Sequence, residues 1–488
     1  MASVIEKTIR SAVTPVITAV ANYNRKRLPE PNGGHPFLDG LHAPMQSEET
    51  ISAMQVTGHI PEQLDGRYLR IGPNPLKKAH SPSHHWFVGD GMAHGIRIKG
   101  GEAAWYRNRW IRSNAVSDAL GEPRKPGVRN PRSDTANTNI VGIDGRTFAI
   151  VEAGGFPVEL NDELDTIKHN PFDGTLTHAF SAHPHLDPKT GKYHAICYDA
   201  ATQDTIWHVV VNPKGKVIRE EPIAVQDGPS IHDCAITENF VLVLDLPATL
   251  SMKRLIKGFQ FPYDWNPNHG ARVGLLPKTG SNDDIIWCDV EPCYVFHPAN
   301  AFETADGKVI VDVVVHDSMY AQSPYGPGGD WARFERWTID PETKSVDRKI
   351  IHDKNQEFPR YNERMTAQPY RYVYSVALAE NDSGVFDRGG SQLFKHDLES
   401  GETLTRELGE DRYPGEFVFV PRSDDSVVDA KEDAREDDGW LIGLVIDAAN
   451  ETTELQILNA DDFMGEPQAV IHVPHRIPPG FHGNWVAN

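Results

Sequence analysis

The sequence contains no long apolar run. No stretch approaches the about 20 consecutive apolar residues that a membrane-spanning helix needs, and 39% of the 488 residues are hydrophobic. Met1 to Arg10 is not followed by an apolar segment with a small-residue cleavage site, so no secretory signal is recognised. These features predict a soluble protein rather than an integral membrane protein.

Cysteine is scarce, and the few cysteines show no metal-binding or redox spacing. None of the four stands in a Cys-x-x-Cys pair; they are Cys197, Cys234, Cys288 and Cys293. A few cysteines without a disulfide spacing pattern are typical of proteins in a reducing compartment. We therefore expect buried free thiols and a cytoplasmic location.

Basic residues are also fewer than acidic residues. Lys and Arg number 48 against 69 Asp and Glu, which gives a formal net charge of -21. A surface this acidic repels phosphate backbones, so the sequence predicts no nucleic-acid partner. Part of the excess lies in the run from Asp424 to Asp438, which we interpret as a solvated loop.

Several common catalytic signatures are absent. The sequence has no Gly-x-Gly-x-x-Gly, no P-loop, no Gly-x-Ser-x-Gly and no His-Glu-x-x-His. Dinucleotide-binding proteins, P-loop nucleotidases, serine hydrolases with a nucleophile elbow and zincin-type metalloproteases are therefore disfavoured.

Short β-strands dominate what is present. Candidate strands rich in Val, Ile, Tyr and Phe are bounded by Gly, Pro, Asp and Asn; they are Arg67–Ile71, Thr147–Glu152, Tyr193–Tyr198, Ile206–Val211, Phe240–Asp245, Lys308–Val315, Tyr370–Ala377, Glu416–Pro421, Trp440–Ile446 and Ala469–Val473. The 40 glycines and 36 prolines exceed their usual combined share of about 12%, which suits a chain with many turns.

One turn type recurs along the chain and indicates hairpins. Asp or Asn begins each of these turns; they span Asp187–Lys192, Asn212–Lys216, Asp340–Lys344 and Asp397–Glu402. Length alone favours about three domains, but all-β folds often run longer as one unit. A β-propeller takes about 60–70 residues per four-stranded blade and suits this length better than one sandwich or barrel.

Two segments depart from the strand pattern. Residues 2–22 carry apolar side chains at helical spacing, interrupted by Pro15. Three interpretations remain open for them: a helix laid on the body, a membrane-surface helix or a frayed tail. We expect an N-terminal helical or flexible extension over residues 1–30 and one catalytic domain over residues 31–488.

The second segment, Leu250–Phe261, is basic and apolar, whereas the chain as a whole is acidic. Its apolar residues interleave with Lys253, Arg254 and Lys257. It is either a packed helix between two blades or a surface that contacts a membrane.

Four of the 22 histidines stand beside strand-like sequence in widely separated parts of the chain. They are His183, His232, His297 and His482. In a radial fold the innermost strands of all blades face one axis, so ligands from distant segments can converge there. Imidazole suits Fe, Zn, Cu and Ni. Each histidine taken alone has a simpler interpretation as a satisfied core residue.

Three glutamates lie in apolar, strand-like contexts. They are Glu152, Glu357 and Glu416. A carboxylate among such neighbours needs a partner that offsets its desolvation, and the second N–H of a metal-bound imidazole is one such partner. Each glutamate taken alone could also be an ordinary surface residue on an edge strand.

The motifs around these residues resemble the carotenoid cleavage oxygenases over nearly the whole chain, from Asp65 to Trp485. The histidine motifs are Ser181–Pro184 followed by Asp187–Gly191, His232-Asp233 with Thr237, Glu238 and Asn239, Phe296-His297 with Asn300 and Ala301, and Gly480–Gly483. The further motifs are Gly89–His94, Asn137–Asn139 before Glu152, Glu357–Arg360 and Gly415–Arg422.

This resemblance implies a fold and a metal site. The fold would be a seven-bladed β-propeller with a cap of loops and short helices over one face. One Fe(II) per chain would sit on the axis, held by His183, His232, His297 and His482. The three glutamates would orient three of these ligands, and His183 would be the ligand without a glutamate. Thr138 matches the family threonine that crowds one open metal position.

The resemblance also implies a reaction. Four neutral imidazoles leave two octahedral positions open, and O2 is the co-substrate. O2 would add across an alkene C=C bond to give two carbonyl products that retain both oxygen atoms. The substrate would be a carotenoid or apocarotenoid.

The branch of the family is inferred from one position. Stilbene-cleaving members carry Lys directly before the first glutamate and a nearby Tyr, and this pair holds a phenol. Here Val151 precedes Glu152, and no Tyr occurs between Tyr106 and Tyr193. This favours an apolar polyene over a stilbene or phenylpropene. Retinoid isomerisation and a metal-free propeller that serves as a binding scaffold are two further hypotheses.

A carotenoid is nearly insoluble in water, so the resemblance also implies that substrate is collected from a bilayer. We expect transient membrane contact through Leu250–Phe261, with its three cations facing anionic headgroups. Pro15 makes the N-terminal stripe the weaker candidate. The location would then be cytoplasmic with peripheral membrane association.

Overall fold

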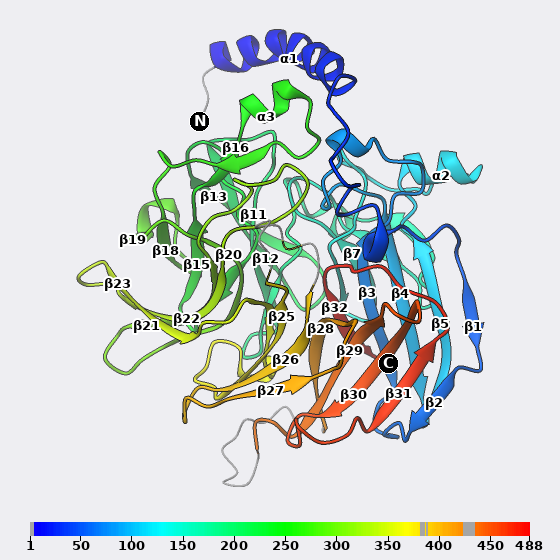
Figure 1. The fold of residues 1–488 in the computed structure, drawn as a ribbon. Helices are drawn as coiled ribbons and strands as arrows, with labels where there is room; N and C mark the ends of the chain where they lie inside the picture. The colour runs from blue at the N-terminus through cyan, green and yellow to red at the C-terminus, as the bar shows by residue number, and fades with distance from the viewer. Residues whose placement is uncertain (1–3, 381–385, 387–388, 423–434) are drawn as a thin grey trace.

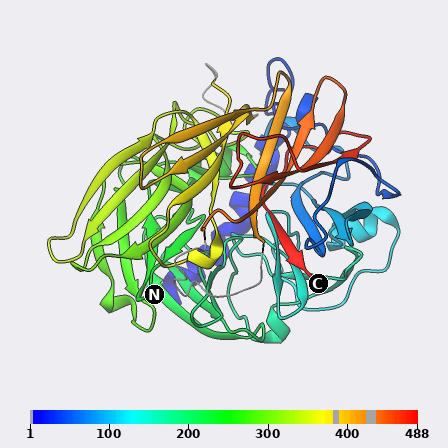
Figure 2. The same ribbon diagram turned by 90° about the horizontal axis from the view of Figure 1, so that it is seen from below.

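The computed structural model describes residues 4–380, 386, 389–422 and 435–488, with side chains from residue 15 onward. Seven antiparallel sheets of four or five strands follow one another around the molecule in chain order. Figure 2 shows this order, which runs from the blue N-terminal sheet through green and yellow until the red C-terminal strand lies beside the blue sheet again. The predicted seven-bladed β-propeller is therefore confirmed.

The strands of the first four blades are given in their order within each sheet. They are β1 (Thr50–Ser52), β5 (Glu102–Trp110), β4 (Gly91–Lys99), β3 (Gly66–Pro73) and β32 (Gly483–Ala487); β6 (Asn139–Ile143), β7 (Arg146–Ile150), β8 (Val158–Leu160) and β9 (Thr166–His169); β10 (His185–Asp187), β11 (Lys192–Cys197), β12 (Thr205–Val211) and β13 (Val217–Ala224); and β14 (Cys234–Ile236), β15 (Phe240–Asp245), β18 (Arg272–Pro277) and β19 (Ile286–Asp289).

The remaining blades follow in the same way. They are β20 (Tyr294–Glu303), β21 (Val309–His316), β22 (Ala332–Asp340) and β23 (Ser345–His352); β24 (Gln356–Arg360), β25 (Tyr372–Leu378), β26 (Gly389–Asp397) and β27 (Thr403–Glu407); and β28 (Arg412–Pro421), β29 (Gly439–Asp447), β30 (Thr452–Asn459), β31 (Ala469–Val473) and β2 (Gln55–Gly58).

The few other elements are short. They are the helices α1 (Val4–Arg25), α2 (Asn114–Leu120) and α3 (Met252–Lys257), the two-stranded sheet of β16 (Ala248–Leu250) and β17 (Tyr263–Trp265), and 3₁₀ turns at Gly40–His42, Ser81–Ser83, Phe172–Gly174, Asn282–Asp284 and Glu363–Met365. No helix of the described residues is long and apolar enough to cross a bilayer.

The ring is closed by both ends of the chain. β32, which precedes the C-terminus, pairs with β3 of the first blade, and β2 pairs with β31 of the last blade. Two strands close to opposite ends of the chain thus complete two neighbouring sheets. This double closure fixes the position of the residues that precede β32.

All ten predicted strands are present, and the four predicted turns connect paired strands. In each turn the side-chain oxygen of the first residue accepts backbone N–H bonds from residues further along, as with Asn212 and both Lys214 and Lys216. Several predicted boundaries differ by one or two residues, and the one that bears on the site is the end of β7 at Ile150, which leaves Glu152 in the connection that follows. This connection needs tight turning, with φ of 61° at Ala153 and 112° at Gly154.

Helix α1 lies across α3 at one end of the molecule (Figure 1). Asn24 Nδ2 donates to the carbonyl of Ile256 at 2.8 Å, and Arg25 Nε donates to the carbonyl of Gly258 at 2.8 Å. The helix continues through Pro15, so proline does not divide it as the interrupted stripe had suggested.

Two sequence interpretations need correction here. Arg254 does not face solvent: it is 8% exposed, donates to Asp264 and to the carbonyl of Ser323, and also contacts the carbonyl of Tyr320. The acidic run from Asp424 to Asp438 is not solvated throughout. Most of it lies outside the described residues, but Asp437 is buried and accepts from Lys395 Nζ at 2.7 Å.

Candidate metal centre

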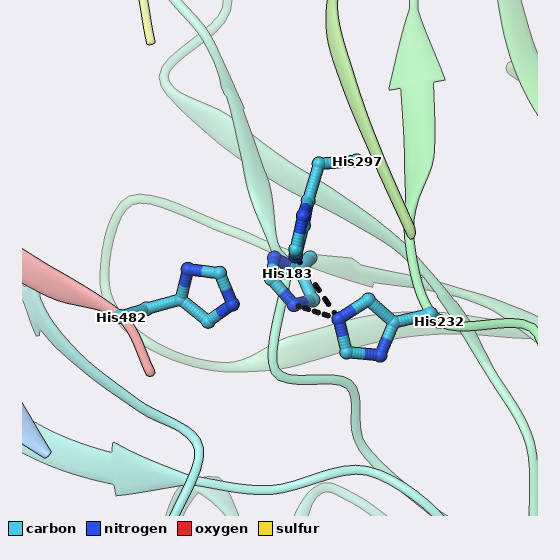
Figure 3. Close-up of side chains that lie close together, drawn as sticks. All are labelled: His183, His232, His297 and His482. Atoms are coloured by element: carbon cyan, nitrogen blue, oxygen red, sulfur yellow. Dashed lines mark hydrogen bonds between the residues drawn. The ribbon is translucent and has the colours of Figure 1, made fainter. Parts of the chain in front are cut away.

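The four predicted histidines meet at the propeller axis, each from a different blade. His183 and His232 lie just before β10 and β14, His297 lies within β20, and His482 directly precedes β32. Their rings point toward one another in Figure 3. Nε2 of His232 lies 3.0 Å from Nε2 of His183 and 3.1 Å from Nε2 of His297. One nitrogen from each of the four residues lies within 4.8 Å of the others.

The innermost strands explain why such distant residues converge. Neighbouring innermost strands contact each other along the series β10, β14, β20, β24, β28, β32 and β6. Each of the seven strands carries one predicted site residue in it or directly before it. These are His183, His232, His297, Glu357, Glu416, His482 and Thr138.

Each of three histidines is held by one predicted glutamate. Nδ1 of His232 lies 2.9 and 3.0 Å from the two carboxylate oxygens of Glu152. Nδ1 of His297 lies 2.6 Å from Glu357 Oε2, and Nδ1 of His482 lies 3.2 Å from Glu416 Oε1.

These contacts decide where the ring protons lie. A neutral imidazole has one N–H, and a carboxylate accepts it, so Nδ1 carries the proton. Each Nε2 then presents a lone pair toward the axis.

Local backbone irregularities aim these side chains at the axis. The β20–β21 pairing shifts register on both sides of Pro298, beside His297, and the β28–β29 pairing shifts between Pro414 and Phe417, around Glu416. The β24–β25 pairing shifts after Glu357, where Phe358 has a φ of 54°. Such bulges turn a side chain away from its regular direction and are common beside functional sites.

Further partners hold two of the glutamates in their ionised form. Burial opposes ionisation of Glu357, but His297 and His316 donate to its two oxygens and keep its pKa well below the usual range. Burial likewise opposes ionisation of Glu416. Arg360, His482 and the backbone N–H of Gly483 outweigh it and lower the pKa of Glu416 to about 2.

The donor set fits a divalent cation. Burial and the neighbouring histidines hold the pKa of His183 well below its ordinary value, and burial lowers the pKa of His482 to about 4. His183 and His482 are therefore neutral near pH 7 and can offer lone pairs. At His297 burial is outweighed by Glu357, which raises the pKa, so a bound metal would have to displace that proton. Two nitrogens each about 2.1 Å from one ion and at a right angle would be about 3.0 Å apart, which matches the nitrogen spacing in this site.

Thr138 lies at the opening of this group. Its hydroxyl donates to Asn137 Oδ1 at 2.9 Å, and its carbonyl accepts from the backbone N–H of His482 at 3.2 Å. The side chain is 6% exposed and lines a cavity. Thr138 therefore binds the backbone of one histidine and also borders the cavity.

A cavity of about 510 Å³ lies over the centre. Three of the four histidines line it, whereas His183 does not. Its wall is largely apolar and includes six phenylalanines, which are Phe87, Phe261, Phe296, Phe358, Phe386 and Phe481. Val151 is also part of the wall, and none of the described lining residues is a lysine. The space is suited to an apolar molecule.

Sequence reasoning missed several residues of the site. Tyr198 and Tyr263 line the cavity, although the sequence analysis expected no phenolic anchor because no Tyr lies close to Val151 in sequence. Tyr198 Oη lies 3.4 Å from Ser230 Oγ. His316 and Arg360 support the glutamates from outside. Arg360 stands in the Glu357–Arg360 motif, which was the available signal for it.

Comparisons with known proteins agree with this geometry. A family model described as retinal pigment epithelial membrane protein matches residues 42–487. The carotenoid cleavage oxygenase of Mycobacterium tuberculosis is 37% identical over 92% of this chain and 97% of its own length.

Two solved structures share the fold. Cobalt-substituted apocarotenoid oxygenase from Synechocystis has a TM-score of 0.80 and 28% identity over 93% of this chain and 98% of its own. Lignostilbene dioxygenase from Pseudomonas brassicacearum has a TM-score of 0.82 and 26% identity over 94% of this chain and 100% of its own length.

The support from Glu357 predicts a measurable change in metal affinity. Glu357→Gln removes the negative charge beside His297, and loss of such a partner typically weakens metal binding about 10–100-fold. We expect a larger dissociation constant for Co²⁺, measured by competition with a chromophoric chelator.

Glu335 provides the matched control. It is a buried glutamate on β22 that pairs with Arg348 on β23 and not with any of the four histidines. Glu335→Gln should leave Co²⁺ affinity unchanged. Equal affinity in both variants and the unmodified protein would show that Glu357 does not support a metal ligand.

Proposed function

The chain belongs to the carotenoid cleavage oxygenase family of dioxygenases, and we propose that it is a non-haem Fe(II) enzyme that cleaves a C=C bond of a carotenoid or apocarotenoid with O2. Two aldehydes are the products. The observation that carries this proposal is the group of four inward-facing imidazole nitrogens beneath an aromatic cavity. The cavity brings an elongated alkene to the one place where these ligands converge.

The histidines would hold the iron, and Glu152, Glu357 and Glu416 keep three of them in the tautomer that a metal needs. When bound, ferrous iron supplies the reactivity toward O2. The reaction is balanced without a reductant, since one C=C and one O=O bond are replaced by two C=O bonds. Neither a proton nor an external electron has to enter the cavity.

The protein's own contribution is to place the alkene and exclude water. The aromatic wall holds a polyene through apolar contact, which is non-directional and tolerates sliding along the cavity. Thr138 borders the open side of the metal centre and restricts what can approach it. The substrate therefore lies beside the metal without having to coordinate it.

Substrate class should follow from the apolar wall. A phenol hydroxyl buried without a partner costs roughly 1–3 kcal/mol, so we expect apo-8′-carotenal to be cleaved about tenfold or more faster than resveratrol. The measurement is chromatography and mass spectrometry of the aldehydes formed by iron-loaded protein. His482→Ala should form none, since it loses a metal ligand.

Tyr198 favours one second candidate, a stilbene or phenylpropene oxygenase, because it lines the cavity and carries a hydroxyl with which a phenol could form a hydrogen bond. Faster cleavage of resveratrol, together with a loss of that activity in Tyr198→Phe, would replace the carotenoid proposal with this one.

Substrate is proposed to arrive from a bilayer through the surface formed by α1 and α3. Met252 and Ile256 on α3 are 39% and 40% exposed, and Lys253 and Lys257 beside them are exposed as well. Val16 on α1 is 62% exposed. The chain continues from α3 into Gln260 and Phe261, which line the cavity, so this surface leads toward the site. Arg254 has no part in it, since its side chain is buried.

The double variant Met252→Asp/Ile256→Asp tests this surface. It places two charges where apolar side chains would enter the interface, so binding to anionic liposomes should fall and cleavage of membrane-borne carotenoid should slow. Activity on detergent-solubilised apocarotenal should stay near normal.

Ile218→Asp/Ile350→Asp is the control, because these residues are 52% and 48% exposed on the outer strands of two blades. Liposome binding that the α3 variant leaves unchanged would show that another surface contacts the membrane.

A further inference from the structure

His183 differs from the other three histidines in its surroundings. It does not line the cavity, and no glutamate contacts its Nδ1 among the described residues. The carboxylate nearest to Nδ1 belongs to Asp233, whose Oδ2 lies 3.7 Å away. His183 therefore faces the carboxylate of a residue that directly follows another of the four histidines in sequence.

Asp233 is firmly oriented by two donors. Nε2 of His185 lies 2.7 Å from Oδ1, and the backbone N–H of Cys234 donates to the same oxygen at 2.6 Å. The side chain is 4% exposed. Both donors reach Oδ1, and no described donor forms a hydrogen bond with Oδ2. The second oxygen of a buried carboxylate is thus directed at the Nδ1 edge of His183.

A buried carboxylate that is only half satisfied is costly. Its cost is offset where a positive or polarised N–H faces the free oxygen, as the Nδ1–H of a metal-bound imidazole does. The distance of 3.7 Å exceeds a hydrogen bond of about 3.0 Å, so the interaction is electrostatic and weaker than the three glutamate contacts.

We propose that Asp233 is the positioning carboxylate of His183 and that His185 holds Asp233 in place. All four histidines then have a carboxylate, one of them on the side of the site away from the cavity. The inference rests on the proposed metal site, and it assigns no contact with substrate to either residue.

His185, Asp233 and Cys234 also lie close enough together to suggest a second metal site. Two observations argue against it. Burial raises the pKa of the Cys234 thiol well above its ordinary value, so the thiol stays protonated, and the Asp233 oxygen is already engaged by His185 and Cys234 N–H. The group is a hydrogen-bonded support rather than a ligand set.

Metal binding to the full chain tests the proposal without turnover. Asp233→Asn keeps an oxygen that can accept from Cys234 N–H but removes the charge that faces His183. Its affinity for Co²⁺ should fall about tenfold, the lower end for such partners, and the visible absorption of bound Co²⁺ should shift. The thermal stability of the metal-free variant should stay close to that of the unmodified protein.

Two further variants separate positioning from packing. His185→Gln retains an N–H donor for Asp233 and should stay within a few-fold of normal affinity, whereas His185→Leu should resemble Asp233→Asn. Asp312→Asn removes another buried carboxylate, whose partners are Arg336 and Tyr370 and not any of the four histidines. It should lower stability and leave Co²⁺ affinity and absorption unchanged.

Each outcome has a definite meaning. Normal Co²⁺ affinity and absorption in Asp233→Asn would overturn the inference, as would a loss of stability that alone accounts for weaker binding. A second equivalent of Co²⁺ that disappears in Cys234→Ser would overturn it in favour of a second site. If the unmodified protein binds no Co²⁺, the proposed function itself fails.

Discussion

Four imidazole nitrogens held within 4.8 Å of one another are the constraint on which the rest of this structure depends. Lone pairs at such short distances repel unless a cation lies among them or a proton lies between them. Three glutamates, of which Glu357 and Glu416 are buried, accept the outer N–H groups, which leaves the inner nitrogens for a cation. The glutamates in turn are stabilised by His316, Arg360 and backbone N–H groups, so the polar network extends outward from the axis.

The closure of the propeller holds this network together. His482 directly precedes the last strand, and its backbone N–H is bound by the carbonyl of Thr138 from the second blade. Pairing of β32 with β3 therefore positions a metal ligand as well as completing a sheet. The other three histidines are carried by consecutive blades, so the ring arrangement brings four distant residues to the axis, where local bulges direct the side chains inward.

Much of the fold could be read from the sequence because it depends on local patterns. Alternating apolar residues and Asp- or Asn-led turns identified strands and hairpins such as those at Asn212 and Asp340. The motifs identified the family of the chain, and the family in turn pointed to the four histidines and three glutamates. Local patterns could not show that Arg254 turns inward, because its partners Tyr320 and Ser323 are distant in sequence. Tyr198 in the cavity and the contact of Asp233 with His183 were hidden for the same reason.

The central claim is that one metal ion lies among these four histidines. Anomalous diffraction at the iron absorption edge, from crystals of the iron-loaded protein, tests it most directly. The account predicts a single strong peak on the propeller axis, between Nε2 of His183, His232, His297 and His482. A peak at His185, Asp233 and Cys234 instead, or no peak in crystals of protein shown to contain iron, would contradict it.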